Sequence, residues 1–83
     1  MTRVLVVDPD DQFARDVESG LTELGCEVER AGNAEGAMLL AHADRPDLIL
    51  LTVELPDANG FSLCSKMRRD AKLKKVPLIV LSS

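Results

Sequence analysis

The chain contains three short runs of aliphatic residues that are widely separated in the sequence. They extend from Val4 to Val7, from Leu48 to Leu51 and from Leu78 to Leu81. None of them alternates polar with apolar residues, which is typical of strands buried on both faces of a parallel sheet. Because parallel strands need long crossover connections, usually helical, these runs predict an α/β fold.

The segment after the first run has the period of an amphipathic helix. Apolar residues at spacings of four, four and three predict a helix from about Asp10 to Leu24, and Gly25 is expected to end it. The residues from Cys26 to Ala31 are more polar and predict a strand at an edge of the sheet. The apolar stripe of the helix consists of Phe13, Val17, Leu21 and Leu24.

Two further helices are expected before the last run. Asn33 is a helix cap for a segment that reaches about Ala43, and a third helix is predicted from Phe61 to about Asp70. The resulting order, β-α-β-α-β-α-β, predicts a parallel sheet with right-handed crossovers. At 83 residues the chain is one domain or less.

Charge and composition exclude several functional classes. The net charge of -4 argues against nonspecific binding of nucleic acid, which requires a basic surface. The longest apolar run falls far short of the ~20 residues of a membrane span, so no membrane insertion is expected. Cys26 and Cys64 lie far apart without a histidine companion. This arrangement signals neither a metal site nor a disulfide framework, and a cytoplasmic protein with reduced thiols is expected.

Basic residues cluster near the end of the third predicted helix. One interpretation is a solvated helix face and loop, because charge runs usually lie in water. The other is a docking patch for an acidic partner. The cluster consists of Lys66, Arg68, Arg69, Lys72, Lys74 and Lys75.

The second aliphatic run leads into the most distinctive segment of the chain. It ends at Thr52 and continues into a Leu-Pro-x-x-x-Gly loop from Leu55 to Gly60. Together with the acidic end of the first strand, the order of elements and the final Val-Leu-Ser-Ser, this loop resembles the receiver (CheY-like) family of response regulators. The resemblance implies a three-layer, flavodoxin-like parallel sheet in the order 2-1-3-4, and a role in bacterial signal transduction.

The functional positions of that family fall on five residues of this chain. The resemblance places the acid pair after the first strand on Asp8 and Pro9, so that proline replaces a carboxylate that would hold Mg²⁺. It places the phosphoacceptor aspartate on Thr52. The residue whose backbone carbonyl would bind the metal is Glu54, and the switch hydroxyl is Ser82. We expect no metal site, no cofactor and no enzymatic activity.

Asp8 and Pro9 have a second interpretation, in which Asp8 caps the first helix and Pro9 is its first residue. Thr52 likewise has alternatives, a backbone hydrogen bond or modification by a threonine kinase. Its hydroxyl is not ionised at pH 7 and would need a general base to act as a nucleophile.

The resemblance therefore implies a pseudo-receiver, a module that binds protein partners without being phosphorylated. Within the family, a run of eight residues resembles atypical receivers, one of them from a gliding-motility protein, which suggests motility or polarity control. The alternatives are a regulatory domain that binds a nucleotide or another small ligand, and an active receiver with unusual chemistry. The run consists of Gly60, Cys64, Lys66, Asp70, Leu73, Lys74, Val76 and Pro77.

The resemblance covers residues 1–83 but only part of a receiver, because family members continue with a fourth helix, a fifth strand and a fifth helix. A C-terminally truncated receiver would leave its fourth strand at an unprotected edge, a template for pairing with another chain. We expect a homodimer joined through this strand or through a domain swap. The alternative is a fragment without a biological dimer. The strand consists of Leu78, Ile79, Val80 and Leu81.

Overall fold

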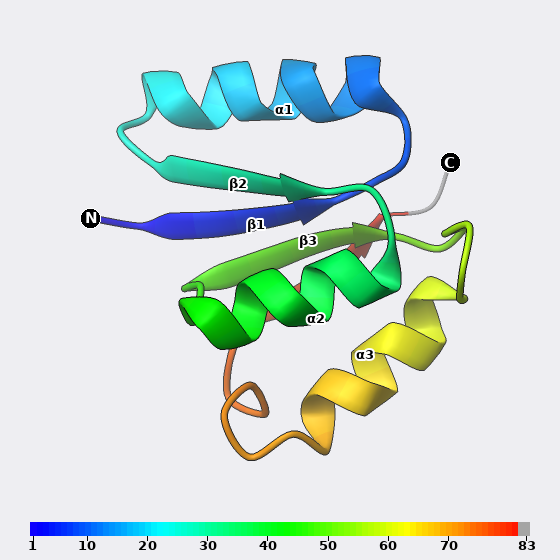
Figure 1. Cartoon of the computed structure of the whole chain (residues 1–83). Helices are drawn as coiled ribbons and strands as arrows, with labels where there is room; N and C mark the ends of the chain where they lie inside the picture. The colour runs from blue at the N-terminus through cyan, green and yellow to red at the C-terminus, as the bar shows by residue number, and fades with distance from the viewer. Residues whose placement is uncertain (82–83) are drawn as a thin grey trace.

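The computed structural model describes residues 1–81, which form a parallel four-stranded sheet between helices (Figure 1). Helix α1 covers one face, and α2 and α3 cover the other. The strand order is β2-β1-β3-β4, which confirms the predicted three-layer α/β fold. The elements are β1 (Arg3–Val7), α1 (Asp11–Glu23), β2 (Glu27–Ala31), α2 (Ala34–Ala43), β3 (Leu48–Thr52), α3 (Gly60–Arg68) and β4 (Leu78–Leu81).

Successive residues of the central strands supply opposite faces of the sheet, as the pleat requires. On the α2 and α3 side, Leu5, Val7 and Ile49 pack with side chains of both helices. On the α1 side, Val4 and Val6 pack with Ala14. Because β1 lies inside the sheet and is covered on both faces, its aliphatic run is buried without alternation, as the sequence predicted.

Helix α1 ends with the two hydrogen bonds of a Schellman motif. The N–H of Gly25 donates to the carbonyl of Thr22, and the N–H of Cys26 donates to that of Leu21, each at 3.0 Å. Gly25 has φ of +88°, in the left-handed region that glycine adopts without steric cost. The expected helix stop at Gly25 is confirmed.

The start of α1 differs from one sequence interpretation. Asp10, and not Asp8, caps the helix, because its carboxylate accepts the N–H of Phe13 at 3.1 Å. Pro9 therefore precedes the cap and is not the first helical residue. The carboxylate of Asp8 instead accepts the N–H of Asp10 at 2.8 Å, which shapes the turn that leads into the helix.

The apolar stripe of α1 is only partly covered. Val17 and Leu21 pack against the sheet, but the side chains of Phe13 and Leu24 are 39% and 79% exposed. Leu24 lies at the C-cap, beyond the last turn that faces the sheet. The buried contact is centred on Ala14, a position that the four-residue stripe did not include.

Strand β4 pairs with β3 and lies at the edge of the sheet that residues 1–81 form. Its burial is less complete than that of β1, and Ile79 is 47% exposed. The expectation of pairing through this strand stays a prediction. Helix α3 begins at Gly60 and ends at Arg68, slightly earlier than the sequence suggested at both ends.

Candidate functional site

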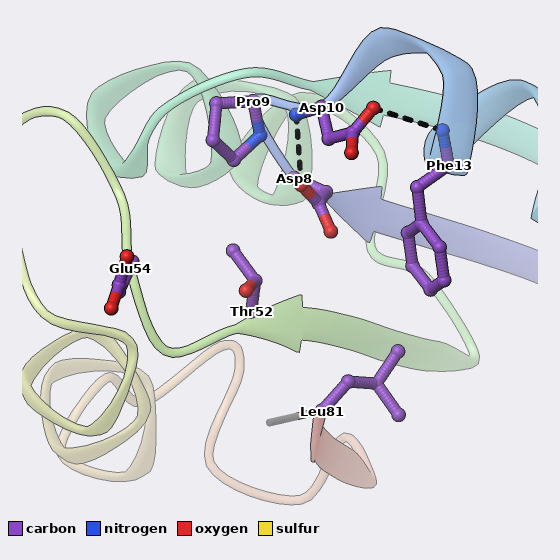
Figure 2. A pocket seen from close by; sticks show the side chains of 7 residues that line it. All are labelled: Asp8, Pro9, Asp10, Phe13, Thr52, Glu54 and Leu81. Carbon is purple, nitrogen blue, oxygen red and sulfur yellow. Dashed lines mark hydrogen bonds between the residues drawn. The ribbon is translucent and has the colours of Figure 1, made fainter. Parts of the chain in front are cut away.

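A cavity of ≈ 340 Å³ lies at the carboxyl ends of the strands (Figure 2). The residues around it come from the ends of β1, β3 and β4, from the start of α1 and from the loop after β3. The lining residues are Asp8, Pro9, Asp10, Phe13, Thr52, Glu54 and Leu81. Four of the five residues predicted for the pocket are among them, and the fifth, Ser82, lies outside the described residues.

The position of this cavity follows from the topology. Strands β1 and β3 are neighbours, but the chain leaves β1 toward β2 on one side and leaves β3 toward β4 on the other. Loops that diverge in this way open a crevice at the carboxyl ends of the two strands, where open α/β sheets bind their ligands.

Asp8 follows β1 directly and is held in place by its backbone. Its N–H donates to the carbonyl of Ala31 at 3.0 Å, extending the pairing of β1 with β2 by one residue. Its side chain points toward the cavity, where one carboxylate oxygen accepts the N–H of Asp10 (Figure 2). Pro9 lies beside it on the rim and offers no side-chain ligand to a cation.

Thr52 ends β3, opposite Leu81 in the register of β4. Its side chain points into the cavity across from Asp8 (Figure 2). Among residues 1–81 its hydroxyl makes no hydrogen bond, so the backbone bond considered from the sequence is absent from the described part of the chain. The histidine of the chain, His42, is hydrogen-bonded to Asp70 instead and supplies no base to this hydroxyl.

The loop after β3 closes tightly onto the start of α3. The N–H of Gly60 donates to the carbonyl of Val53 at 2.7 Å, and Asn59 caps α3 by accepting the N–H of Phe61 at 2.7 Å. Glu54 is exposed on this loop and forms an isolated bridge with Asn59. In Figure 2 its side chain lies apart from those of Asp8 and Thr52.

The same loop carries Asp57, a residue that the sequence analysis did not single out. Its carboxylate accepts the N–H groups of Ala34 and Glu35, at 2.8 and 3.1 Å, in the first turn of α2. These two hydrogen bonds, the one from Ala34 first, hold the pKa of Asp57 below its ordinary value. No local sequence pattern predicts this contact, because its partners lie 22 and 23 residues away along the chain.

The lining of the cavity is acidic. It carries the carboxylates of Asp8, Asp10 and Glu54, and residues 1–81 contribute no cationic side chain to it. Yet within this part of the chain no three histidine, cysteine or carboxylate side chains come together as a metal-binding group. Asp10 is engaged with its helix and Glu54 lies apart, so Asp8 is the carboxylate that faces Thr52 most directly.

A doubly wound parallel sheet with its polar residues gathered at one crevice is the architecture of ligand-binding and signalling α/β domains. The sequence model of the response regulator receiver domain matches residues 4–83. The chain therefore belongs to the response regulator receiver family, whose members are signalling modules of two-component signal transduction.

Individual relatives and solved structures agree with this assignment. The DNA-binding dual master transcriptional regulator RpaA of Synechocystis is 32% identical over 83 residues, which is 100% of this chain and 34% of the relative. The transcriptional regulatory protein AfsQ1 of Streptomyces coelicolor is 36% identical over 100% of this chain and 36% of its own length. The structure of the chemotaxis response regulator CheY4 of Vibrio cholerae superposes with a TM-score of 0.92 at 30% identity.

These matches cover nearly all of this chain but only part of each relative. The chain spans about a third of the length of RpaA and AfsQ1, 34% and 36%. It covers 67% of the CheY4 chain, while 96% of this chain is included in that match. Among residues 1–81, no helix combines the length and apolar character needed to cross a membrane.

Proposed function

We propose that this chain is a pseudo-receiver, which takes part in bacterial signal transduction by binding protein partners and without being phosphorylated. The observation that carries the proposal is Thr52 at the end of β3, pointing into the cavity at the position where the receiver resemblance places the acceptor aspartate. A carboxylate is ionised at pH 7, whereas a threonine hydroxyl is protonated, and the histidine of the chain is hydrogen-bonded to Asp70 and supplies no base to it.

The residues around Thr52 support the same proposal. Phosphoryl transfer to a receiver depends on a Mg²⁺ ion, and this ion usually takes one or two carboxylates, several waters and phosphate oxygens. Pro9 replaces one of the carboxylates that the resemblance requires. The remaining one, Asp8, already accepts the N–H of Asp10. The cavity thus lacks the carboxylate nucleophile and one of the carboxylates of the cation site.

Mass spectrometry tests this proposal directly. The 83-residue chain is incubated with acetyl phosphate and Mg²⁺, and a receiver domain that carries the acceptor aspartate is treated in parallel as the positive control. We expect the control to gain one phosphoryl group and this chain to keep its intact mass. A phosphorylated fraction of this chain would support the third possibility, an active receiver with rerouted chemistry, and overturn the proposal.

Binding of a small ligand is the second candidate, and the cavity itself favours it. A crevice of ≈ 340 Å³ at the reversal of strand order is within the size range of small-molecule sites. The acidic lining disfavours the nucleotide or other anion considered from the sequence. A thermal-shift screen that includes nucleotides, inorganic anions and organic cations separates this candidate from the first. Saturable stabilisation abolished by Thr52→Leu would support a ligand in the cavity.

A further inference from the structure

The positive charges of this chain are concentrated in one segment, and the bases of that segment lack ion pairs within residues 1–81. Six of its ten basic residues lie between residues 66 and 75, where Asp70 is the single acid. Of the four bases elsewhere, Arg3, Arg15 and Arg30 are paired with carboxylates, at distances between 2.5 and 3.3 Å, and Arg45 makes no ion pair within residues 1–81. No ion pair joins any of the six to an acid of residues 1–81. We call these six residues the basic patch: Lys66, Arg68, Arg69, Lys72, Lys74 and Lys75.

The one acid within this segment is occupied by internal contacts. The carboxylate of Asp70 lies 2.6 Å from the imidazole of His42 and accepts the N–H groups of Lys72 and Leu73, at 2.9 and 3.3 Å. These contacts hold the turn after α3, and the hydrogen bond from His42 contributes most to lowering the pKa of Asp70. Asp70 therefore holds the backbone of the patch in place, and it leaves the segment with six bases against one acid.

The patch is also built on a fixed backbone. The guanidinium of Arg68 donates to the carbonyls of Lys74 and Val76, at 3.1 and 3.2 Å, and so ties the end of α3 to the residues before β4. Leu73 and Val76 are buried beneath the turn. The exposed side chains of Lys74 and Lys75 thus extend from a loop anchored on both sides. An anchored loop loses less conformational entropy on binding than a flexible one.

Most of the patch lies near the amino ends of the strands, whereas the cavity lies at their carboxyl ends. Helix α3 starts at the carboxyl ends of the strands and runs back, so its last turn and the loop to β4 lie at their amino ends (Figure 1). A partner on the patch would leave the cavity open. The patch can therefore serve a binding role whatever the state of Thr52.

We propose that the basic patch is a docking site for an acidic segment of a partner protein. This proposal specifies a class of partner for the pseudo-receiver, and it rests on the proposed function as a protein-binding module. The segment between residues 66 and 75 carries six bases and one acid, whereas the rest of the chain carries four bases and thirteen acids, which together give the net charge of -4. A short carboxylate-rich peptide placed on the patch is complementary in charge to this segment.

Nucleic acid fits this surface less well. The longest dimension of the folded chain is 32 Å, and the rest of this small chain carries thirteen acids and four bases. A duplex lying across the patch would bring phosphates within a Debye length, about 8 Å at physiological salt, of this remainder. The segment between residues 66 and 75 contains no aromatic residue on which single-stranded bases could stack.

Fluorescence anisotropy with a labelled peptide of alternating glutamate and glycine tests the proposal on the 83-residue chain. The patch variant is Lys74→Gln/Lys75→Gln, which changes two exposed residues whose side chains make no hydrogen bond or ion pair within residues 1–81. The matched control is Ser19→Glu/Thr22→Glu on the exposed side of α1, which changes the net charge by the same amount. Exposed ion pairs contribute about 0.2 to 1 kcal/mol each, so we expect the patch variant to bind about twofold to thirtyfold more weakly. The control should bind within about twofold of the parent, and affinity should fall with added salt.

Each other result would overturn the proposal. Absence of saturable peptide binding would show that the patch is not a docking site. An equal loss of peptide affinity in both variants would show that only the net charge of the chain matters. Tighter binding of a labelled DNA duplex than of the peptide would assign the patch to nucleic acid. Circular dichroism confirms that the variants are folded. The outcome is independent of the phosphorylation assay, which reports on the cavity and would alone decide whether the chain is a pseudo-receiver.

Discussion

Gly60 controls how closely α3 approaches the end of β3, and its replacement by alanine should destabilise the fold strongly. A Cβ atom at this position would lie 2.9 Å from the carbonyl carbon of Thr52 and from the Cα of Val53, and closer still to the carbonyl oxygen of Thr52. These are backbone atoms that cannot rotate away. The start of α3 and the end of β3 would have to separate, at the residue that faces the cavity.

The size of the effect follows from three contributions. Steric overpacking in a tight interior site costs about 1 to 3 kcal/mol. Separation also weakens the hydrogen bond from the N–H of Gly60 to Val53, 2.7 Å long, and such a bond contributes about 1 kcal/mol. The higher helix propensity of alanine offsets about 0.5 to 1 kcal/mol. We expect a net loss of about 1 to 3.5 kcal/mol in the free energy of unfolding.

Gly20 provides a matched control. It lies inside α1, and a Cβ added there would meet no atom within 4 Å. Gly20→Ala should therefore stabilise the chain by about 0.5 to 1 kcal/mol through helix propensity alone. The same chemical change then has opposite signs at two positions, and the local geometry is the reason.

Urea unfolding followed by far-ultraviolet circular dichroism measures both variants, because the chain has no tryptophan or tyrosine for fluorescence. Equal slopes with urea would show that the free energies can be compared. A Gly60→Ala variant without a folding transition would have lost at least the stability of the parent. A Gly60→Ala variant within about 0.5 kcal/mol of the parent would refute the steric argument.

Three further predictions follow from the site, the loop and the sheet edge. Thr52→Asp alone should gain no phosphoryl group from acetyl phosphate with Mg²⁺, because Pro9 still withholds a ligand; intact mass spectrometry checks this, and a phosphorylated fraction would contradict it. The pKa of Asp57 is lowered in the folded state, so its contribution to stability is present above its unfolded value, about 4, and is lost as pH falls through the lower folded value. Asp57→Asn should thus flatten the loss of stability in acid, measured as urea midpoints at several pH values, and parallel curves for the two proteins would refute the assignment. Light scattering should find the 83-residue chain dimeric, and Ile79→Lys on the exposed side of β4 should make it monomeric. If the variant stays dimeric, the dimer interface does not include β4.

The fold could be predicted because its signals are local and redundant. The aliphatic run from Val4 to Val7 predicts a strand buried on both faces. In the structure, helices on both sides of the sheet bury this strand. Asn33 caps α2 and Gly25 ends α1 where the sequence indicated. The start of α1 was less certain because Asp8 and Asp10 are equally good caps by type, and only the geometry of the turn decides between them.

Topology alone explains why two of the residues predicted for the pocket lie close together. Asp8 and Thr52 end neighbouring strands, so they meet at the same edge of the sheet. Phe13 was predicted as part of the apolar stripe of the first helix, and its place on the wall of the cavity was not foreseen. Helical periodicity does not say where the sheet ends beneath a helix, and this decides which residues of the stripe reach the cavity. Asp57 was missed because its contact joins two loops, and no periodic pattern records such a contact.

The carboxylate of Asp57 also gives this fold a measurable indicator of loop motion. The N–H groups in the first turn of a helix have no acceptor within the helix and ordinarily exchange rapidly with deuterated solvent. Here the N–H groups of Ala34 and Glu35 are held by Asp57, while that of Gly36 is held by Asn33 from within the same turn. Exchange at the first two sites therefore requires the loop after β3 to leave α2, whereas exchange at the third does not. The ratio of these rates, measured residue by residue, reports how often the loop beside the cavity opens while the rest of α2 stays folded.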